Sequence, residues 1–188
     1  MKAIETRNKF YLRKSANTLT LFRIALGLPV IAALGNGLNS IAWALILLAA
    51  ITDIADGYLA RKAGGGSIWG ARLDPLADKI LLTAPLIWLT VNMQIPIWSL
   101  WLIITRELIV SAWRSHETQG GPAKLSAKTK TLLQFTSILL MLWPHSWGGT
   151  PFILFLNRTG WYLFWLSLFF AYYSAFRYLK SQLNSHLN

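Results

Sequence analysis

The sequence predicts an all-α membrane protein, in which six helices cross a bilayer and a short N-terminal helix lies on its surface. Hydrophobic residues make up 54% of the 188 residues, which exceeds the apolar share of an ordinary soluble domain. They gather in apolar stretches that are each close to the roughly 20 residues a helix needs to cross the hydrocarbon core. Basic residues fall mainly in alternate connections between these stretches. We therefore expect a single membrane domain over residues 1–188.

Residues 1–16 form a basic segment in which Phe10, Tyr11 and Leu12 stand among Lys and Arg side chains. This mixture favours a helix that lies on anionic headgroups over a solvated flank. The first two membrane helices are expected over Leu19–Leu38 and Ser40–Ala60, because a Gly-Asn-Gly turn separates these apolar stretches.

The third and fourth helices are expected over Asp74–Asn92 and Ile95–Arg114. Asp74 followed by Pro75 is typical of a helix start, with Asp as the cap and Pro at the first helical position. The last two helices are expected over Thr131–Trp147 and Phe152–Leu179.

The distribution of charge predicts the orientation in the membrane. In the connections, the terminal segments and the adjoining span ends, fourteen Lys and Arg residues lie on the side that holds both termini, and Arg158 lies on the other side. Cytoplasmic loops carry the excess of basic residues, so both termini are expected in the cytoplasm, which requires an even number of spans. The net charge of +11 then indicates contact with anionic membrane lipids rather than with nucleic acid.

Four of the seven acidic residues lie in one short stretch, residues 53–78. Asp53 and Asp56 are three residues apart, and Asp74 and Asp78 are four apart, so each pair shares one face of a helix. A short connection makes the two helices antiparallel neighbours. The two pairs can therefore converge into one pocket at cytoplasmic depth.

Carboxylates inside a membrane protein need a physical reason, since each costs about 2.5–3.5 kcal/mol at the centre of a membrane helix. Divalent cations would offset this cost, and carboxylate oxygens select Mg²⁺, Mn²⁺ or Ca²⁺. The alternative is a set of structural ion pairs with Arg61, Arg72 and Lys79. Acidic residues within membrane spans are functional by default, which favours the metal site.

The spacing D-x2-D-G-x2-A-R-x8-G-x3-D-x3-D is met at every fixed position, by Asp53, Asp56, Gly57, Ala60, Arg61, Gly70, Asp74 and Asp78. With this motif the chain resembles the CDP-alcohol phosphatidyltransferase family. The resemblance implies an integral membrane enzyme, usually a homodimer, with a site for two divalent ions, Mg²⁺ or Mn²⁺. Such an enzyme transfers a phosphatidyl group from CDP-diacylglycerol to an alcohol and releases CMP.

The resemblance also implies roles for single residues. The four aspartates hold metal, and Asp78 also serves as the general base. Gly70 matches a packing position. The positions that correspond to the CDP-diacylglycerol site as a whole are Asn17, Asp56, Gly57, Ala60, Arg61 and Gly70.

The acceptor alcohol is indicated by Arg106, which lies too deep in its apolar stretch to be a flanking charge. A buried Arg beside an aspartate site suggests an anionic acceptor, because a guanidinium can bind a phosphate with two hydrogen bonds. Residues 17–23, 95–111 and 128–131 are similar to one branch of the family, the phosphatidylglycerophosphate synthases. This similarity implies sn-glycerol 3-phosphate as the acceptor, with its phosphate bound by Arg106, Arg114 and Lys128 or Lys130.

Other functions remain open at this stage. A sibling transferase, such as cardiolipin synthase or an inositol-phosphate or serine enzyme, would use another alcohol. An intramembrane prenyltransferase would have a different spacing of acids and more spans. A divalent-cation transporter would need acids near the bilayer midplane and a polar route on both sides. For the transferase we expect a bacterial plasma membrane, with the site facing the cytoplasm.

Overall fold

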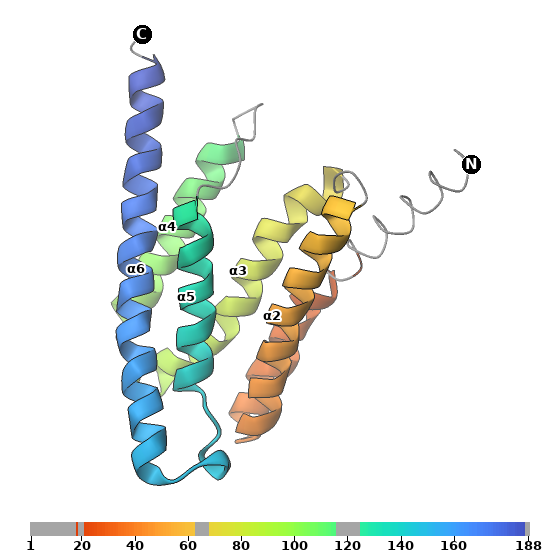
Figure 1. The fold of residues 1–188 in the computed structure, drawn as a ribbon, viewed down its shortest axis with the longest axis vertical. Helices are drawn as coiled ribbons and strands as arrows, with labels where there is room; N and C mark the ends of the chain where they lie inside the picture. The colour runs from red at the N-terminus through yellow and green to blue at the C-terminus, as the bar shows by residue number, and fades with distance from the viewer. Residues whose placement is uncertain (1–17, 19–20, 63–67, 116–124, 187–188) are drawn as a thin grey trace, which may run out of the picture. The chain divides into compact units, whose positions relative to one another are not determined.

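The computed structural model describes residue 18 and residues 21–62, 68–115 and 125–186. Regular structure in these residues is helical throughout (Figure 1), so the all-α prediction is confirmed for this part of the chain. The expected surface helix over residues 1–16 lies outside it. The elements in chain order are a helix over Leu21–Gly35, then α2 (Asn39–Lys62), α3 (Ile68–Val91), α4 (Ile97–Ser115), α5 (Leu125–Met141), the short 3-10 helix η1 (His145–Trp147) and α6 (Thr150–His186).

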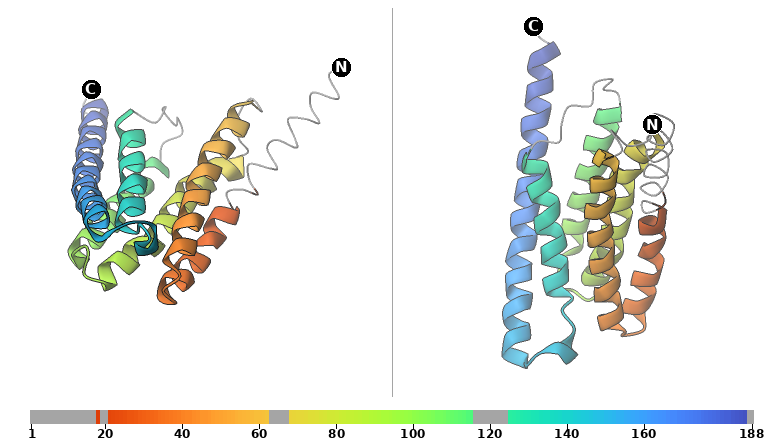
Figure 2. Two further views of the ribbon diagram at one scale, coloured as in Figure 1. Left: turned by 60° about the horizontal axis from the view of Figure 1, so that its bottom comes forward. Right: turned by 45° about the vertical axis from the view of Figure 1, so that its right-hand side comes forward.

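The chain divides into two compact units, residues 1–88 and 89–188. In the first unit, the Leu21–Gly35 helix and α3 run in one direction and α2 runs in the other (Figure 2). The Leu21–Gly35 helix is followed by a turn at Gly37, whose φ of +73° is a conformation that glycine adopts without steric cost. The Gly37 and Leu38 N–H groups donate to the carbonyls of Leu34 and Ala33, at 3.1 and 2.8 Å. This pairing satisfies carbonyls that the helix end would otherwise leave without donors.

The core of the first unit is mostly apolar, apart from the buried Arg23. A Cβ placed on Gly27 would lie 3.9 Å from the carbonyl oxygen of Ile80, so the Leu21–Gly35 helix and α3 are in direct contact there. The apolar side chains that fill this core with no solvent exposure include Val30, Leu34, Ile46 and Leu81.

In the second unit, α5 and α4 both pack against α6. Gly160 allows α6 to approach α5 closely, because a Cβ there would lie 2.9 Å from the Ser137 carbonyl oxygen. The start of α4 contacts α6 through Trp98 and Trp165, whose ring centroids are 5.1 Å apart.

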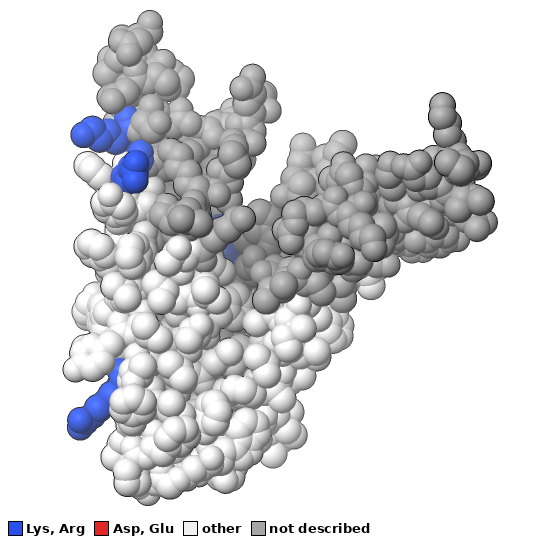
Figure 3. All heavy atoms as spheres, viewed as in Figure 1, with Lys and Arg blue, Asp and Glu red and all other residues white. Residues whose placement is uncertain are grey.

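The length and composition of α6 suit a membrane span, over Thr150–Arg177. Two exposed arginines, Arg158 and Arg177, stand 19 residues apart on this helix, and no charged residue lies between them. That separation is about 28 Å at the helical rise of 1.5 Å per residue, close to the roughly 30 Å of a bilayer's hydrocarbon core. Figure 3 shows the same pattern, with blue side chains near two ends of an uncharged band.

Other described helices contain shorter apolar segments, over Leu21–Gly35, Asn39–Thr52, Lys79–Val91 and Thr131–Met141. With α6, the described residues thus contain five apolar segments of this kind. The six-span topology stays a prediction.

Several predicted boundaries are wrong, two of them near prolines. α3 begins at Ile68 rather than at Asp74, because the apolar residues before Asp74 extend the helix and Pro75 is accommodated inside it. α5 ends at Met141 rather than at Trp147, because the residue before Pro144 is disfavoured in helical geometry and the chain continues as η1.

Candidate active site

The four aspartates lie on α2 and α3, two helices of the first unit that are consecutive in the chain and separated by residues 63–67. Asp53 and Asp56 are in the last ten residues of α2, and Asp74 and Asp78 are in the first eleven of α3. The end of α2 and the start of α3 lie at the same end of the unit (Figure 1). The backbone therefore brings both acidic pairs to one end of the first unit.

The helical register places the aspartates at two matched depths. Asp56 stands six residues before the last residue of α2, and Asp74 stands six residues after the first residue of α3, which is about 9 Å along each helix. Asp53 and Asp78 stand nine and ten residues from the same ends, about 14 and 15 Å. Each depth thus holds one carboxylate from each helix.

The chemistry of this donor set fits divalent cations. Four carboxylates offer hard oxygen ligands of the kind that Mg²⁺ and Mn²⁺ prefer. Two divalent ions, with a total charge of +4, would neutralise the combined charge of −4 on the four carboxylates. The two matched depths would allow each of two ions to take one aspartate from each helix.

The other residues of the motif occupy the same helix ends. Gly57, Ala60 and Arg61 are in the last six residues of α2, and Gly70 is the third residue of α3. These residues lie closer along the helices than the aspartates to the connection between α2 and α3. Asn17 lies outside the described residues.

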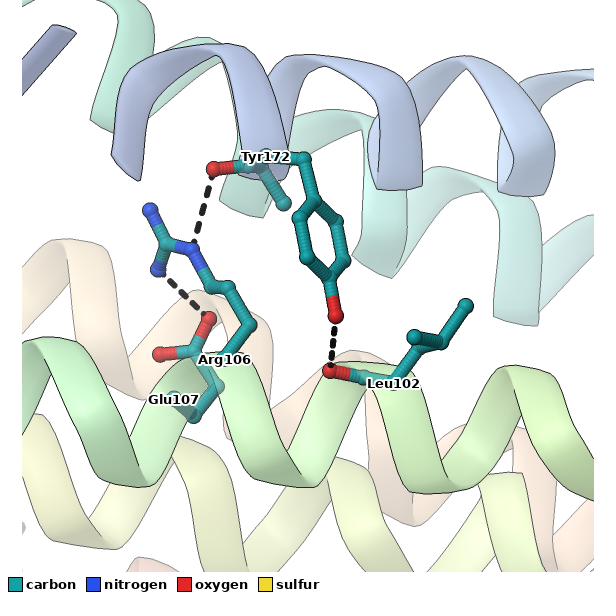
Figure 4. A network of polar contacts seen from close by, with 5 residues as sticks. Leu102, Arg106, Glu107 and Tyr172 are labelled. Carbon is teal, nitrogen blue, oxygen red and sulfur yellow. Dashed lines mark hydrogen bonds and ion pairs between the residues drawn. The ribbon is translucent and has the colours of Figure 1, made fainter. Parts of the chain in front are cut away.

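Arg106 joins α4 to α6 in the second unit (Figure 4). Its side chain is 7% exposed, which confirms the prediction that it is buried. The Nε–H group donates to the carbonyl oxygen of Ala171 at 3.0 Å, and Nη1 forms an ion pair with Glu107 Oε1 at 2.8 Å. Beside it, the Tyr172 hydroxyl donates to the Leu102 carbonyl oxygen at 3.0 Å. Arg106 is therefore part of a polar contact that ties two helices together.

The remaining cations of the predicted acceptor site lie near one end of the second unit. Arg114 is the penultimate residue of α4, and Lys128 and Lys130 are in the first two turns of α5. Both helix ends adjoin residues 116–124, so their backbones bring these cations to the same end. Arg106 stands nine residues before the last residue of α4, about 14 Å from that end.

Sequence reasoning did not single out three polar residues that are buried or take part in polar contacts in the structure. Glu107 and Tyr172 complete the contact around Arg106, and Arg23 is completely enclosed in the first unit. A signal for Arg23 was present, because a charged residue interrupts the apolar stretch that contains it. Tyr172 carried no such signal, since a tyrosine in an aromatic-rich helix is common.

Comparison with known proteins bears on the identity of the chain. The family model of the CDP-alcohol phosphatidyltransferases matches residues 13–173. A Rickettsia bellii protein named "CDP-diacylglycerol--glycerol-3-phosphate 3-phosphatidyltransferase" is 32% identical over 172 residues, covering 88% of this chain and 93% of that protein. A Mycoplasma genitalium protein of the same name is 31% identical, over 93% of this chain and 83% of its own length.

A Mycobacterium tuberculosis protein named "Probable phosphatidylglycerophosphate synthase" is 40% identical over 139 residues. The match covers 70% of this chain and 66% of the mycobacterial protein, just under two thirds of its length. The family match spans the motif, both of its helices and most of the chain on either side. This chain therefore belongs to the CDP-alcohol phosphatidyltransferase family.

Proposed function

We propose that this protein transfers the phosphatidyl group of CDP-diacylglycerol to sn-glycerol 3-phosphate, giving phosphatidylglycerophosphate and CMP. The observation that carries this proposal is the placement of four aspartates at two matched depths on α2 and α3. The names of the relatives that match most of the chain support the same donor and acceptor.

The aspartates are the proposed ligands of two divalent ions, Mg²⁺ or Mn²⁺. When bound, such ions neutralise the pyrophosphate and the departing nucleotide. Asp53, Asp56 and Asp74 serve mainly as ligands. Asp78, one turn after Asp74, serves also as the base.

The reaction needs one proton transfer and one exchange at phosphorus. Asp78 accepts the proton of the free primary hydroxyl of glycerol 3-phosphate, which requires the carboxylate to be within hydrogen-bonding reach of that hydroxyl. The hydroxyl oxygen then bonds to the lipid-side phosphorus of CDP-diacylglycerol. The bond from this phosphorus to the bridging oxygen breaks, and CMP leaves with the electron pair.

Substrate binding is assigned to the motif and to the basic residues of the second unit. Asn17, Asp56, Gly57, Ala60, Arg61 and Gly70 form the proposed site for CDP-diacylglycerol. Gly57 and Gly70 leave room for the nucleotide, because they have no side chain. The phosphate of the acceptor is assigned to Arg106, Arg114, Lys128 and Lys130.

The proposed setting is a bacterial plasma membrane crossed by six helices, with both termini and the active site on the cytoplasmic side. The apolar length of α6 and the excess of basic residues on one side support this orientation. A homodimer, as implied by the family resemblance, is the proposed assembly.

An acceptor screen tests the proposal. The purified protein would receive radiolabelled CDP-diacylglycerol and Mg²⁺ with glycerol 3-phosphate, phosphatidylglycerol, an inositol phosphate or serine in turn. We expect a labelled lipid product and CMP with glycerol 3-phosphate, at a rate at least about 100-fold above that with serine, since serine has no phosphate to fill the assigned basic site. The rate with glycerol 3-phosphate should also exceed the rates with phosphatidylglycerol and with an inositol phosphate. Transfer to another alcohol alone would contradict the assigned acceptor, and no CMP release with any alcohol would contradict the activity.

A further inference from the structure

Arg23, near the start of the Leu21–Gly35 helix, is the largest of the completely buried side chains in the described part of the chain, with 0% exposure. An arginine keeps its positive charge at every accessible pH. Burying such a charge is costly unless a negative group lies nearby. The position of Arg23 in the fold therefore indicates where its negative partner lies.

The contact between Gly27 and Ile80 sets the register of the two helices. They run in the same direction (Figure 2), and a Cβ on Gly27 would lie 3.9 Å from the Ile80 carbonyl oxygen. Arg23 stands one turn before Gly27 on the same helix face, about 6 Å along the axis. The same distance back from Ile80 along α3 reaches residue 76, midway between Asp74 and Asp78.

The first unit offers few alternatives for the negative partner. From residue 21 to residue 88 the sequence contains four acidic residues, Asp53, Asp56, Asp74 and Asp78. Two of them flank the depth of Arg23 on the helix that its own helix contacts. Ala77, between those two aspartates, is also completely buried, so this part of α3 faces the interior.

We propose that Arg23 is a positioning residue that compensates the charge of the α3 aspartates and holds them in place before metal binds. Its complete enclosure separates this role from substrate binding, because a guanidinium that grips a substrate must be reachable from the site. The proposal rests on the proposed function only in assigning Asp74 and Asp78 to the metal site. The metal-free site would carry four negative charges, and Arg23 offsets one of them.

The test measures Mn²⁺ binding and thermal stability of the purified full-length protein. In Arg23→Gln, a positive charge near the metal site is lost, so the Mn²⁺ dissociation constant should fall by roughly threefold to tenfold. The Tm in EDTA should fall by more than the Tm in saturating Mn²⁺, because the metal replaces the missing charge. Arg23→Lys should restore both values in part, and Arg158→Gln, the same change at an exposed site, should leave both unchanged.

A role in packing alone would lower the Tm equally with and without metal and leave Mn²⁺ affinity unchanged, and this result would overturn the proposal. If Arg23→Gln does not fold, a second change decides. Adding Asp74→Asn or Asp78→Asn removes the matching negative charge and should restore folding, whereas Asp53→Asn and Asp56→Asn should not. Failure of both α3 changes to restore folding would also overturn the proposal.

The wild-type protein separates this inference from the proposed function. If it neither binds Mn²⁺ nor releases CMP from CDP-diacylglycerol, the proposed function fails. If the wild-type protein binds Mn²⁺ and releases CMP, but Arg23→Gln has the same Mn²⁺ affinity and Tm values as Arg158→Gln, only the role proposed for Arg23 fails.

Discussion

Replacing Arg106 by methionine keeps much of the length of the side chain and removes its charge from the contact between α4 and α6. The hydrogen bond to Ala171 and the ion pair to Glu107 are both lost. The Arg106 side chain is 7% exposed and that of Glu107 is 16% exposed, so water replaces the lost partner poorly. Removing one member of a buried pair costs about 3–5 kcal/mol, and we expect a loss of this size.

Glu107→Gln tests whether the ion pair is the source of that loss. If it is, the double variant Arg106→Met with Glu107→Gln should be more stable than the sum of the single losses predicts, by about 2 kcal/mol, since residues in direct contact couple by 0.5–3 kcal/mol. The assay is the free energy of unfolding, measured by SDS titration in mixed micelles. Additive losses would refute the ion-pair account.

Enzyme kinetics then separate phosphate binding from helix packing. If Arg106 binds the acceptor, Arg106→Ala should raise the KM for glycerol 3-phosphate by at least about tenfold, as expected for a lost charged hydrogen bond, and raise the KM for CDP-diacylglycerol much less. Tyr172→Phe removes a bond between the same two helices, worth about 1 kcal/mol, and should leave the acceptor KM unchanged. An equal rise in both variants would show that packing, rather than phosphate contact, controls this KM.

Three further predictions follow from the fold and the site. Gly160→Ala should destabilise the protein by about 1–3 kcal/mol, because its Cβ would lie 2.9 Å from the Ser137 carbonyl oxygen. Gly35→Ala is the control, because a Cβ there meets nothing within 4 Å. Equal unfolding free energies for the two variants would contradict the close packing of α5 and α6. Asp78→Asn should abolish turnover while CDP-diacylglycerol binding, measured by its rise in Tm, persists; full activity would refute the base. EDTA should stop CMP release and added Mg²⁺ or Mn²⁺ should restore it; a rate indifferent to EDTA would argue against the metal site.

The apolar stretches of the sequence predict where helices form, but not where each one ends. Hydropathy detects the apolar part of α6, yet the helix continues to His186, seven residues beyond the predicted Leu179. Residues outside a bilayer need no apolar pattern to stay helical, so hydropathy does not detect them. The Asp74-Pro75 pair fails for a related reason, because a proline marks a helix start only where the preceding residues do not already form a helix.

The candidate site was also predictable from the sequence only in part. The spacing of the aspartates along the chain is enough to place them at one end of two antiparallel helices, and the observed α2 and α3 confirm that arrangement of the backbone. The contact of Arg106 with Ala171 could not be predicted, because it joins residues 65 positions apart through the packing of α4 on α6. The depth of Arg23 beside α3 likewise depends on the Gly27 contact, which no local pattern indicates.

The number of Mn²⁺ ions bound at the aspartates tests the central claim most directly. Electron paramagnetic resonance of the purified protein should show two bound Mn²⁺ ions per chain, close enough to couple magnetically. Asp56→Asn and Asp74→Asn, which alter one depth from opposite helices, should each weaken binding and remove the coupling. A chain that binds no Mn²⁺, or whose binding is unchanged by both substitutions, would contradict the claim that α2 and α3 together hold a two-metal site.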